Sequence, residues 1–390
     1  YLQNITDIDD KIIQRARELK KTPIEIANEY EKSYYQDMKL LKINSVNKYA
    51  RATDHINEIV SQVQRLIKLG YAYKIKDGYY FDLSKFKNYG KLSGRTTLEA
   101  EDSVSRIDEN KDKKNKGDFC LWKFSKPGEP YWNSDLSMGR PGWHVEDTAI
   151  TEKYLGQQYD IHGGARDLIF PHHEAEIAQM EALTKKPLVK YWIHTGFLDV
   201  KNEKMSKSLG NFITIKDALK KNSPETLRMF FISAHYRSPI NFNENILKQA
   251  KANLDRINNF LINLKNSNGK KDISLLIKKL KKDFIKYMDE DFNTPKALAR
   301  IFSFMNKVNR LNINKKSAKN IKEFFNEINN IFSILKIEEE IPKEIVKLAK
   351  EREEARKNRE YSKSDKLRQE IKNKGYLIED ADSSYIIKKA

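Results

Sequence analysis

Residues 160–176 read DIHGGARDLIFPHHEAE, and this stretch decides the fold class that we expect. Residues 159–162 have the pattern of a short strand that ends at Gly163 and Gly164, and Pro171 opens a helix. A strand, a glycine pair and a helix in this order let a nucleotide approach the backbone closely, as in doubly wound α/β sheets. The stretch therefore indicates an α/β domain with a nucleotide-binding turn, although a glycine pair by itself is a weak signal.

The helix after this turn carries a candidate metal-binding pair. His172 and Glu176 are four residues apart at its start, so both side chains project from one face. A histidine and a carboxylate arranged in this way are natural zinc ligands, whereas in many proteins the same spacing marks only a pair on a surface helix. The distribution of histidine favours the metal, because five of the seven histidines fall between residues 144 and 194.

A lysine-rich loop follows the α/β segment. Residues 204–208 read KMSKS and are followed by LGN. Lys204 and Lys207, three residues apart in a flexible loop, can place two ammonium groups beside a triphosphate while charge develops there. Most lysine-rich pentapeptides are solvated basic loops, but the complete string, the glycine after it and the α/β segment before it favour a catalytic loop.

The composition excludes some classes of protein. No run of about 18 apolar residues occurs in the 390 residues, so we expect no transmembrane helix. The single cysteine, Cys120, excludes an internal disulfide and fits a reducing cytoplasm; its apolar surroundings indicate a buried free thiol outside the site.

Residues 251–390 contain 33 Lys and Arg residues against 21 Asp and Glu residues. This excess favours a polyanion such as nucleic acid as partner, although an AT-biased genome would produce a similar composition.

The rest of the chain changes its pattern several times. The patterns predict, in order, helices at 6–48 and 55–69, a hairpin at 70–82, a charged flexible connection at 101–117, strands at 191–194 and 197–200, helices from 215 to 372, and a closing hairpin at 375–387. The hairpin and the charged connection together indicate a subdomain that is inserted into the α/β domain.

Taken together, these motifs resemble those of the cysteinyl-tRNA synthetases, a class I family, and among them archaeal-type members. The likeness spans essentially the whole chain, with further matches at NITDIDDK (4–11), DFCLWK (118–123), DEDFNTP (289–295) and residues 355–365. It implies an α/β fold class, with an incomplete Rossmann-type catalytic domain and an inserted subdomain, followed by a mainly α-helical bundle and a small C-terminal α+β tRNA-binding unit. The implied domains are the catalytic domain at 1–50 and 135–200, the inserted connective subdomain at 51–134, the KMSKS loop and stem-contact region at 201–250, the helical bundle at 251–338 and the anticodon-binding unit at 339–390.

The resemblance also implies one zinc ion per chain, which reads the thiol of the substrate. A pocket that separates near-isosteres such as cysteine and serine by packing gains only about 1–3 kcal/mol, whereas zinc strongly prefers a soft thiolate. The family's ligands are two cysteines, a histidine and a glutamate. His172 and Glu176 match the last two, Asp147 stands at the second cysteine position, and the first position would lie upstream of Tyr1. Asp147 departs from the family pattern and makes a harder site.

The reaction implied by the resemblance is the activation of L-cysteine by ATP, with Mg²⁺, to cysteinyl-adenylate and its transfer to tRNA(Cys). The implied protein is a cytoplasmic monomer with no membrane partner. The roles carried over are stabilisation of pyrophosphate (Lys204, Lys207), binding of ATP (Gly163, Gly164, Asp167 at the ribose, Lys207) and shaping of the cysteine pocket (Thr6, Trp143, His162). The family's His-x-Gly-His motif does not occur, and the sequence begins after its expected place without an initiator methionine. We therefore expect an N-terminally truncated chain that lacks part of its ATP site.

Two alternatives remain open at this point. A cysteine:amino-sugar ligase shares the same catalytic core, but it has no need for a basic RNA-binding unit at the C-terminus. A non-catalytic tRNA-binding fragment would keep the scaffold, but the intact Lys204 and Lys207 argue against long decay of the site.

Overall fold

The computed structural model describes the chain except for residues 96–109, 201–202, 206–209, 336–341, 382–383 and 390, and it divides into two compact units. The first unit comprises Tyr1–Ile334 and the second Leu335–Ala390. Half of the predicted flexible connection and most of the lysine-rich loop lie outside the described residues. Among the helices in the described ranges, none has both the length and the apolar composition that a membrane span needs.

The N-terminal elements form a parallel strand pair with three helices. They are β1 (Leu2–Ile5), α1 (Asp10–Leu19), α2 (Pro23–Leu40), β2 (Lys48–Arg51) and α3 (Ile56–Lys68). The helix predicted at 6–48 is wrong as one element, because Lys20 adopts a left-handed φ of 54° and ends α1. Thr22 then caps α2 through a reciprocal bond with Glu25 and places Pro23 in the first turn, so a second helix starts there. The helix predicted at 55–69 is confirmed.

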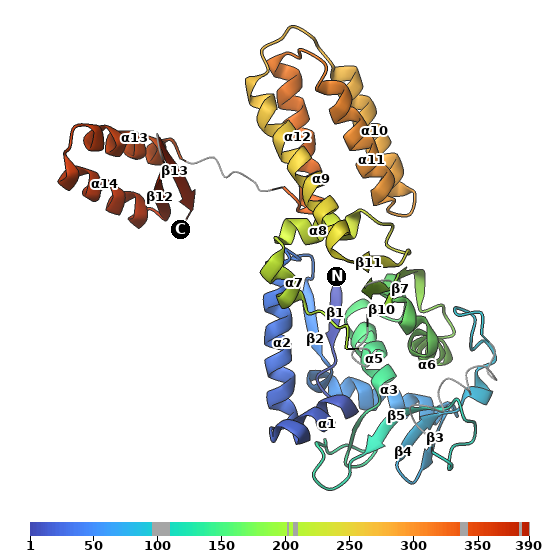
Figure 1. Ribbon diagram of the computed structural model, residues 1–390. Coiled ribbons are helices and arrows are strands. Elements are labelled where there is room, and N and C mark those ends of the chain that lie inside the picture. The colour runs from blue at the N-terminus through green and yellow to red at the C-terminus, as the bar shows by residue number, and fades with distance from the viewer. Residues whose placement is uncertain (96–109, 201–202, 206–209, 336–341, 382–383, 390) are drawn as a thin grey trace. The chain divides into compact units, whose positions relative to one another are not determined.

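The inserted segment is an antiparallel sheet. Its strands lie in the order β3 (Ala72–Ile75), β4 (Gly78–Phe81), β5 (Phe119–Phe124) and β6 (Gly139–Pro141) (Figure 1). The predicted hairpin is confirmed by the pairing of Ala72 with Phe81 through to Ile75 with Gly78. Phe81 stacks on Phe119 with ring centroids 5.0 Å apart, and both rings belong to a buried core that includes residues of α3 and of the catalytic helices. The insertion is therefore packed firmly on α3 and on the helices that follow the insertion.

The helices and strands of the histidine-rich segment follow the insertion. They are α5 (Trp143–Leu155), β7 (Tyr159–Ala165), α6 (Glu174–Thr184) and β8 (Val189–Thr195). The predicted strand that ends in the glycine pair is confirmed, and β7 continues one residue further, because it pairs in parallel with β8 as far as Ala165 opposite Thr195. The helix predicted from Pro171 begins as a wide turn over Ile169–His173 and becomes a regular α-helix at Glu174.

The rest of the first unit is mostly helical, as predicted. Its elements are β9 (Leu198–Val200), β10 (Glu203–Lys204), α7 (Ile215–Lys221), α8 (Pro224–Ile232), β11 (Ile240–Phe242), α9 (Glu244–Asn263), α10 (Ser274–Asp289), α11 (Thr294–Val308) and α12 (Lys315–Phe332). Helices α9 to α12 form a bundle (Figure 1) around buried rings such as Phe260, Phe304 and Phe325. The short strand β11 departs from the helical prediction, because it adds to β9 in parallel and orders the segment before the bundle.

The second unit is a small α+β fold. It contains α13 (Lys343–Lys357), α14 (Tyr361–Asn373), β12 (Tyr376–Ala381) and β13 (Ser384–Lys389). The predicted closing hairpin is confirmed by antiparallel pairing of β12 with β13. Ile345, Ala349, Ile371 and Ile378 form its core, so this unit has a buried apolar centre of its own.

Candidate active site

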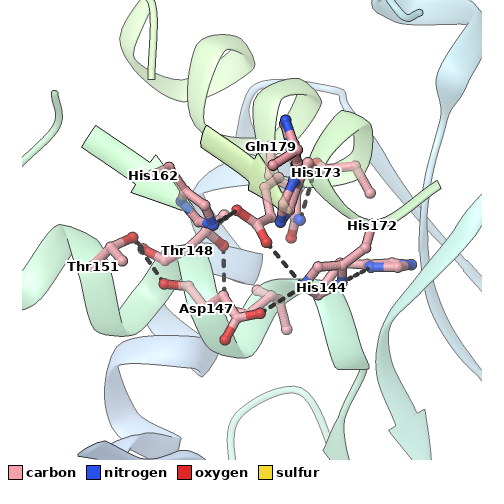
Figure 2. Close-up of polar contacts among 12 residues, drawn as sticks. His144, Asp147, Thr148, Thr151, His162, His172, His173 and Gln179 are labelled. Atoms are coloured by element: carbon pink, nitrogen blue, oxygen red, sulfur yellow. Dashed lines mark hydrogen bonds and ion pairs between the residues drawn. The ribbon is translucent and has the colours of Figure 1, made fainter. Parts of the chain in front are cut away.

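Three ligand-type side chains from two helices meet in the interior of the first unit. Asp147 comes from α5, while His172 and Glu176 come from the start of α6 and the turn before it. The Nε2 atom of His172 lies 2.7 Å from Oδ2 of Asp147 and 2.9 Å from Oε1 of Glu176 (Figure 2). All three residues are buried. We call Asp147, His172 and Glu176 the metal triad, because their ligand atoms can surround one ion.

The start of α5 positions this group. A Cβ atom on Gly142 would lie 2.0 Å from the carbonyl oxygen of Cys120, so only glycine lets α5 begin this close to β5. Trp143 and Asp147, four residues apart, then face the same side of the helix. The Trp143 ring stacks on His172 with centroids 4.2 Å apart and an interplanar angle of 25°. Trp143 thus forms one wall of the triad, and its place at the cysteine pocket stays a prediction.

The charges in the triad favour a cation between two carboxylates. Burial lowers the pKa of His172, but Glu176 and Asp147 overcome this effect and raise it to about 10. Burial raises the pKa of Glu176, yet His162 and His172 together lower it to about 2. Asp147 keeps a raised pKa, because burial outweighs its hydrogen bond from His172. Oδ1 of Asp147 has no hydrogen-bond partner among the residues that the structure describes. The donor set and this uncommitted oxygen fit a divalent metal ion.

A second layer of histidines surrounds Glu176. His162 Nε2 lies 3.5 Å from Oε2 of Glu176, and His162 Nδ1 lies 2.6 Å from the hydroxyl of Tyr159. His173 Nδ1 lies 2.9 Å from Nε2 of His194. Burial lowers the pKa of His173 to about 3, so its ring is neutral. His162, His173 and Glu176 also lie close enough to share a metal ion. The sequence suggested a histidine cluster, but it gave no role to His173 or His194.

Lys204, the first residue of the lysine-rich loop, lies beside Asp167. Lys204 Nζ lies 3.7 Å from Oδ2 of Asp167 and 4.1 Å from the centre of the Phe197 ring. Lys207 lies outside the described residues. The two side chains expected at the phosphates and ribose of ATP, Lys204 and Asp167, are therefore brought together.

The two glycines of the pair differ in how much room surrounds them. A Cβ atom on Gly164 would lie 2.8 Å from Cε1 of His173, whereas a Cβ atom on Gly163 would meet only an ordinary contact. Glycine at position 164 therefore leaves room for the ring of His173, whether or not a nucleotide binds there.

The family comparison agrees with this geometry. The family described as tRNA synthetases class I (C) catalytic domain matches residues 1–252, and a DALR domain matches residues 283–336. A cysteine–tRNA ligase of Methanococcus maripaludis is 45% identical over 97% of this chain and 84% of its own length. Those of Thermococcus onnurineus and Thermodesulfovibrio yellowstonii are each 43% identical, over 100% and 97% of this chain and 86% and 85% of their own lengths.

The chain belongs to the cysteine–tRNA ligase family. Solved structures support the fold. A Mycobacterium tuberculosis methionyl-tRNA synthetase in complex with methionyl-adenylate superposes with a TM-score of 0.60 at 14% identity, over 79% of this chain and 74% of that chain. The expected class I catalytic fold is confirmed, and the enzyme is a ligase that forms an aminoacyl-tRNA. The amino-sugar ligase and the non-catalytic tRNA-binding protein receive no support from these relatives.

One buried carboxyl group of this ligase was missed from the sequence. Glu146 precedes the triad residue Asp147 and is only 1% exposed. Burial and the neighbouring Asp147 raise the pKa of Glu146 well above its usual value, and Thr6 partly opposes the shift. Thr6, expected at the cysteine pocket, therefore lies beside Glu146. No local spacing marks Glu146, because its burial results from the packing of α5.

A second buried carboxylate ties the insertion to the triad. Glu174, the first residue of α6, lies between His172 and Glu176 in the sequence and is fully buried. Its oxygens accept hydrogen bonds from the backbone N–H groups of Gly90 (3.0 Å), Leu92 (2.8 Å) and Ser93 (2.6 Å). Three N–H donors on one carboxylate hold the segment after β4 against the start of α6.

Proposed function

We propose that this cysteine–tRNA ligase selects its amino acid through a zinc ion held by the metal triad. The reaction is that of the family: ATP activates L-cysteine to cysteinyl-adenylate, and the cysteinyl group is then transferred to tRNA(Cys). The observation that carries the proposal is the contact of one imidazole nitrogen with two buried carboxylates. Zinc bound there supplies a soft positive centre that prefers a thiolate to a hydroxyl.

The protein side chains then have distinct tasks at the two ends of the site. Asp147 and Glu176 balance the charge of the ion, and Trp143 limits the space beside it through its stack on His172. His162 orients Glu176 through their ion pair and is itself fixed by Tyr159. The oxygen of Asp147 makes this site harder than one with a second cysteine, so we expect weaker retention of zinc.

The phosphate end of the site depends on Lys204 and on the loop that contains Lys207. ATP, bound with Mg²⁺, would lie across Gly163 and Gly164, with Asp167 at its ribose. As the cysteine carboxylate attacks the α-phosphate, the two ammonium groups stabilise the departing pyrophosphate. Lys204 contacts Asp167, so the proposed places of these two side chains, at the phosphates and at the ribose, are adjacent.

The parts beyond the catalytic domain would grip the tRNA. The bundle α9–α12 and the unit Leu335–Ala390 belong to the region with a strong excess of lysine and arginine, which suits contacts with phosphates. We assign the stem contacts to residues 201–250 and the anticodon contacts to residues 339–390. We further propose that the enzyme acts as a monomer.

Two measurements on the full-length protein test the role of zinc. Cysteine-dependent ATP–pyrophosphate exchange is followed before and after removal of zinc by a chelator, and metal content is measured separately by elemental analysis. We expect the His172→Ala variant to lose both zinc and exchange, while the matched control Lys153→Ala, an exposed residue of α5 paired with Glu58, keeps both. Exchange at an unchanged rate in zinc-free protein would overturn the proposal.

A further inference from the structure

The turn that carries His172 is irregular. Residues Ile169–His173 form a wide turn in place of regular α-helix, and within it Phe170 has extended backbone angles, with φ −136° and ψ 129°. Wide turns of this kind are rare and occur frequently at functional sites. Because the turn is not regular helix, the place of the His172 ring depends on the contacts that hold the turn from outside.

A loop of the inserted segment, residues 89–95, packs against the part of this turn that precedes His172. The ring of Tyr89 meets the ring of Phe170 edge to face, with centroids 6.2 Å apart. The guanidinium group of Arg95 lies 4.9 Å from the centre of the same ring, a distance at which a cation is attracted to an aromatic face. We call residues 89–95 the clamp loop.

The clamp loop also holds the residue two positions after His172. Glu174 is fully buried. Its two carboxylate oxygens accept hydrogen bonds from three backbone N–H groups of the loop, those of Gly90, Leu92 and Ser93. Neighbouring N–H groups that converge in this way form an anion-binding concavity. The loop takes this shape only with glycine at position 90, because φ there is +91° and a Cβ atom would lie 1.7 Å from a carbonyl oxygen of the same loop.

A third contact of the clamp loop lies further along α6. Lys91 Nζ lies 2.6 Å from each carboxylate oxygen of Glu181. This residue follows Glu174 by seven positions, so both lie on the same face of the helix, two turns apart. Glu176 is only two positions from Glu174, and residues with this spacing do not face each other. The loop therefore lies along one face of α6, and the triad residue Glu176 projects from another.

These contacts link the insertion to the metal triad through the backbone of α6 and of the turn before it. We propose that the clamp loop, through Glu174, positions His172 and Glu176 for zinc, so that the insertion takes part in metal binding without supplying a ligand. Loss of groups that hold metal ligands in place typically weakens metal binding about 10- to 100-fold. The effect is mutual: if the intact loop favours zinc, bound zinc favours the intact loop by the same factor. This role rests on the proposed function.

Two variants of the full-length protein separate positioning of the triad from mere attachment of the insertion. Glu174→Gln keeps the shape of the side chain but replaces an acceptor oxygen by an NH2 donor, which faces the N–H groups of the loop. Lys91→Met is the matched control, because it breaks the contact of the same loop with Glu181, two turns further along the helix. Zinc affinity is measured by competition with a chelator. We expect it to fall about tenfold in Glu174→Gln and to change less than about twofold in Lys91→Met, which loses only a partly exposed ion pair. Unchanged affinity in Glu174→Gln, or an equal loss in both variants, would overturn this role of the loop.

Hydrogen–deuterium exchange of the wild-type protein tests the same link without a variant. It carries the test if thermal unfolding shows that Glu174→Gln is not folded. Zinc added to metal-free protein should slow exchange in peptides that contain residues 90–93 by about tenfold, the factor expected from the mutual effect. The β3–β4 hairpin of the same insertion is the control. Equal slowing in the hairpin would show general stabilisation and, like unchanged exchange at residues 90–93, would contradict the proposed link. A wild-type protein that binds no zinc would instead refute the proposed function.

Discussion

Binding of zinc to the metal triad has to displace a proton. In the metal-free protein the pKa of His172 is about 10, because the carboxylates of Glu176 and Asp147 outweigh the effect of burial. At neutral pH a proton on Nε2 therefore occupies the place where the ion would bind, between the two carboxylates. We predict that zinc binding releases about one proton and strengthens as the pH rises.

The size of the effect follows from the distance between the pKa and the pH. At pH 7.5, a pKa of about 10 weakens apparent zinc affinity roughly 300-fold relative to deprotonated protein, at 1.36 kcal/mol for each pH unit. Affinity should rise about tenfold from pH 6.5 to 7.5 and again from 7.5 to 8.5. The stability of the metal-free protein changes with pH in the opposite direction to the zinc affinity. Since the pKa is raised on folding, the proton stabilises metal-free protein fully below about pH 6.5, and this contribution is lost as the pH rises toward 10.

Calorimetry provides the direct assay. Zinc is titrated into metal-free protein in buffers with different ionisation enthalpies, which yields the number of protons released, and competition with a chelator of known pH dependence yields the affinity. His235→Gln serves as the control, because His235 lies elsewhere in the first unit, 3.8 Å from Asp291. Tight zinc binding without proton release at pH 7.5, or an affinity that is flat from pH 6.5 to 8.5, would refute the charge arrangement described for His172.

Three further predictions concern other parts of the enzyme. Lys204→Ala should lower the rate of pyrophosphate exchange about 100-fold or more with little change in the KM for ATP, since it acts on developing charge, whereas the exposed Lys190→Ala should match the wild type. Gly164→Ala should displace the His173 ring, because the added Cβ would lie 2.8 Å from Cε1; we expect exchange to fall more than tenfold while circular dichroism remains unchanged. Arg228→Met removes hydrogen bonds of 2.6 and 2.9 Å to two backbone carbonyls that link α8 to α12 and to the end of α2. The free energy of unfolding, measured with urea, should fall by about 2–3 kcal/mol. A fall below about 0.5 kcal/mol would contradict the importance of these bonds.

Local patterns predicted the parts of the site that depend on neighbours in sequence. The spacing of His172 and Glu176 places both on one face of a helix, and the structure brings them within contact of each other. Asp147 lies 25 positions before His172, so no helical periodicity connects them. It could be assigned only from the resemblance to cysteinyl-tRNA synthetases, and its part in metal binding stays a prediction.

The features that were missed depend on packing between distant segments. The strand β7 extends one residue past its glycines because β8 offers parallel partners as far as Ala165, and the sequence of β7 does not reveal those partners. The break before Pro23 is different. Thr22, Pro23 and Glu25 form a recognisable helix start, so the split of the first helix could have been predicted from the capping pattern. Glu146 offered no comparable signal, because only the fold buries it.

The hydrogen bonds of Glu174 with three amide groups of residues 90–93 have a consequence for protein engineering. Inserted segments are attractive units to exchange between synthetases, since they are joined to the catalytic domain at only two points of the chain. In this protein the inserted segment has a third attachment to the catalytic domain. Residues 90–93 are bound by Glu174, which lies between His172 and Glu176 in the sequence. A chimera that alters the backbone course of this segment would leave a buried carboxylate without donors, next to the residues that face the substrate. A chimera that exchanges the insertion should therefore also exchange the first turn of α6.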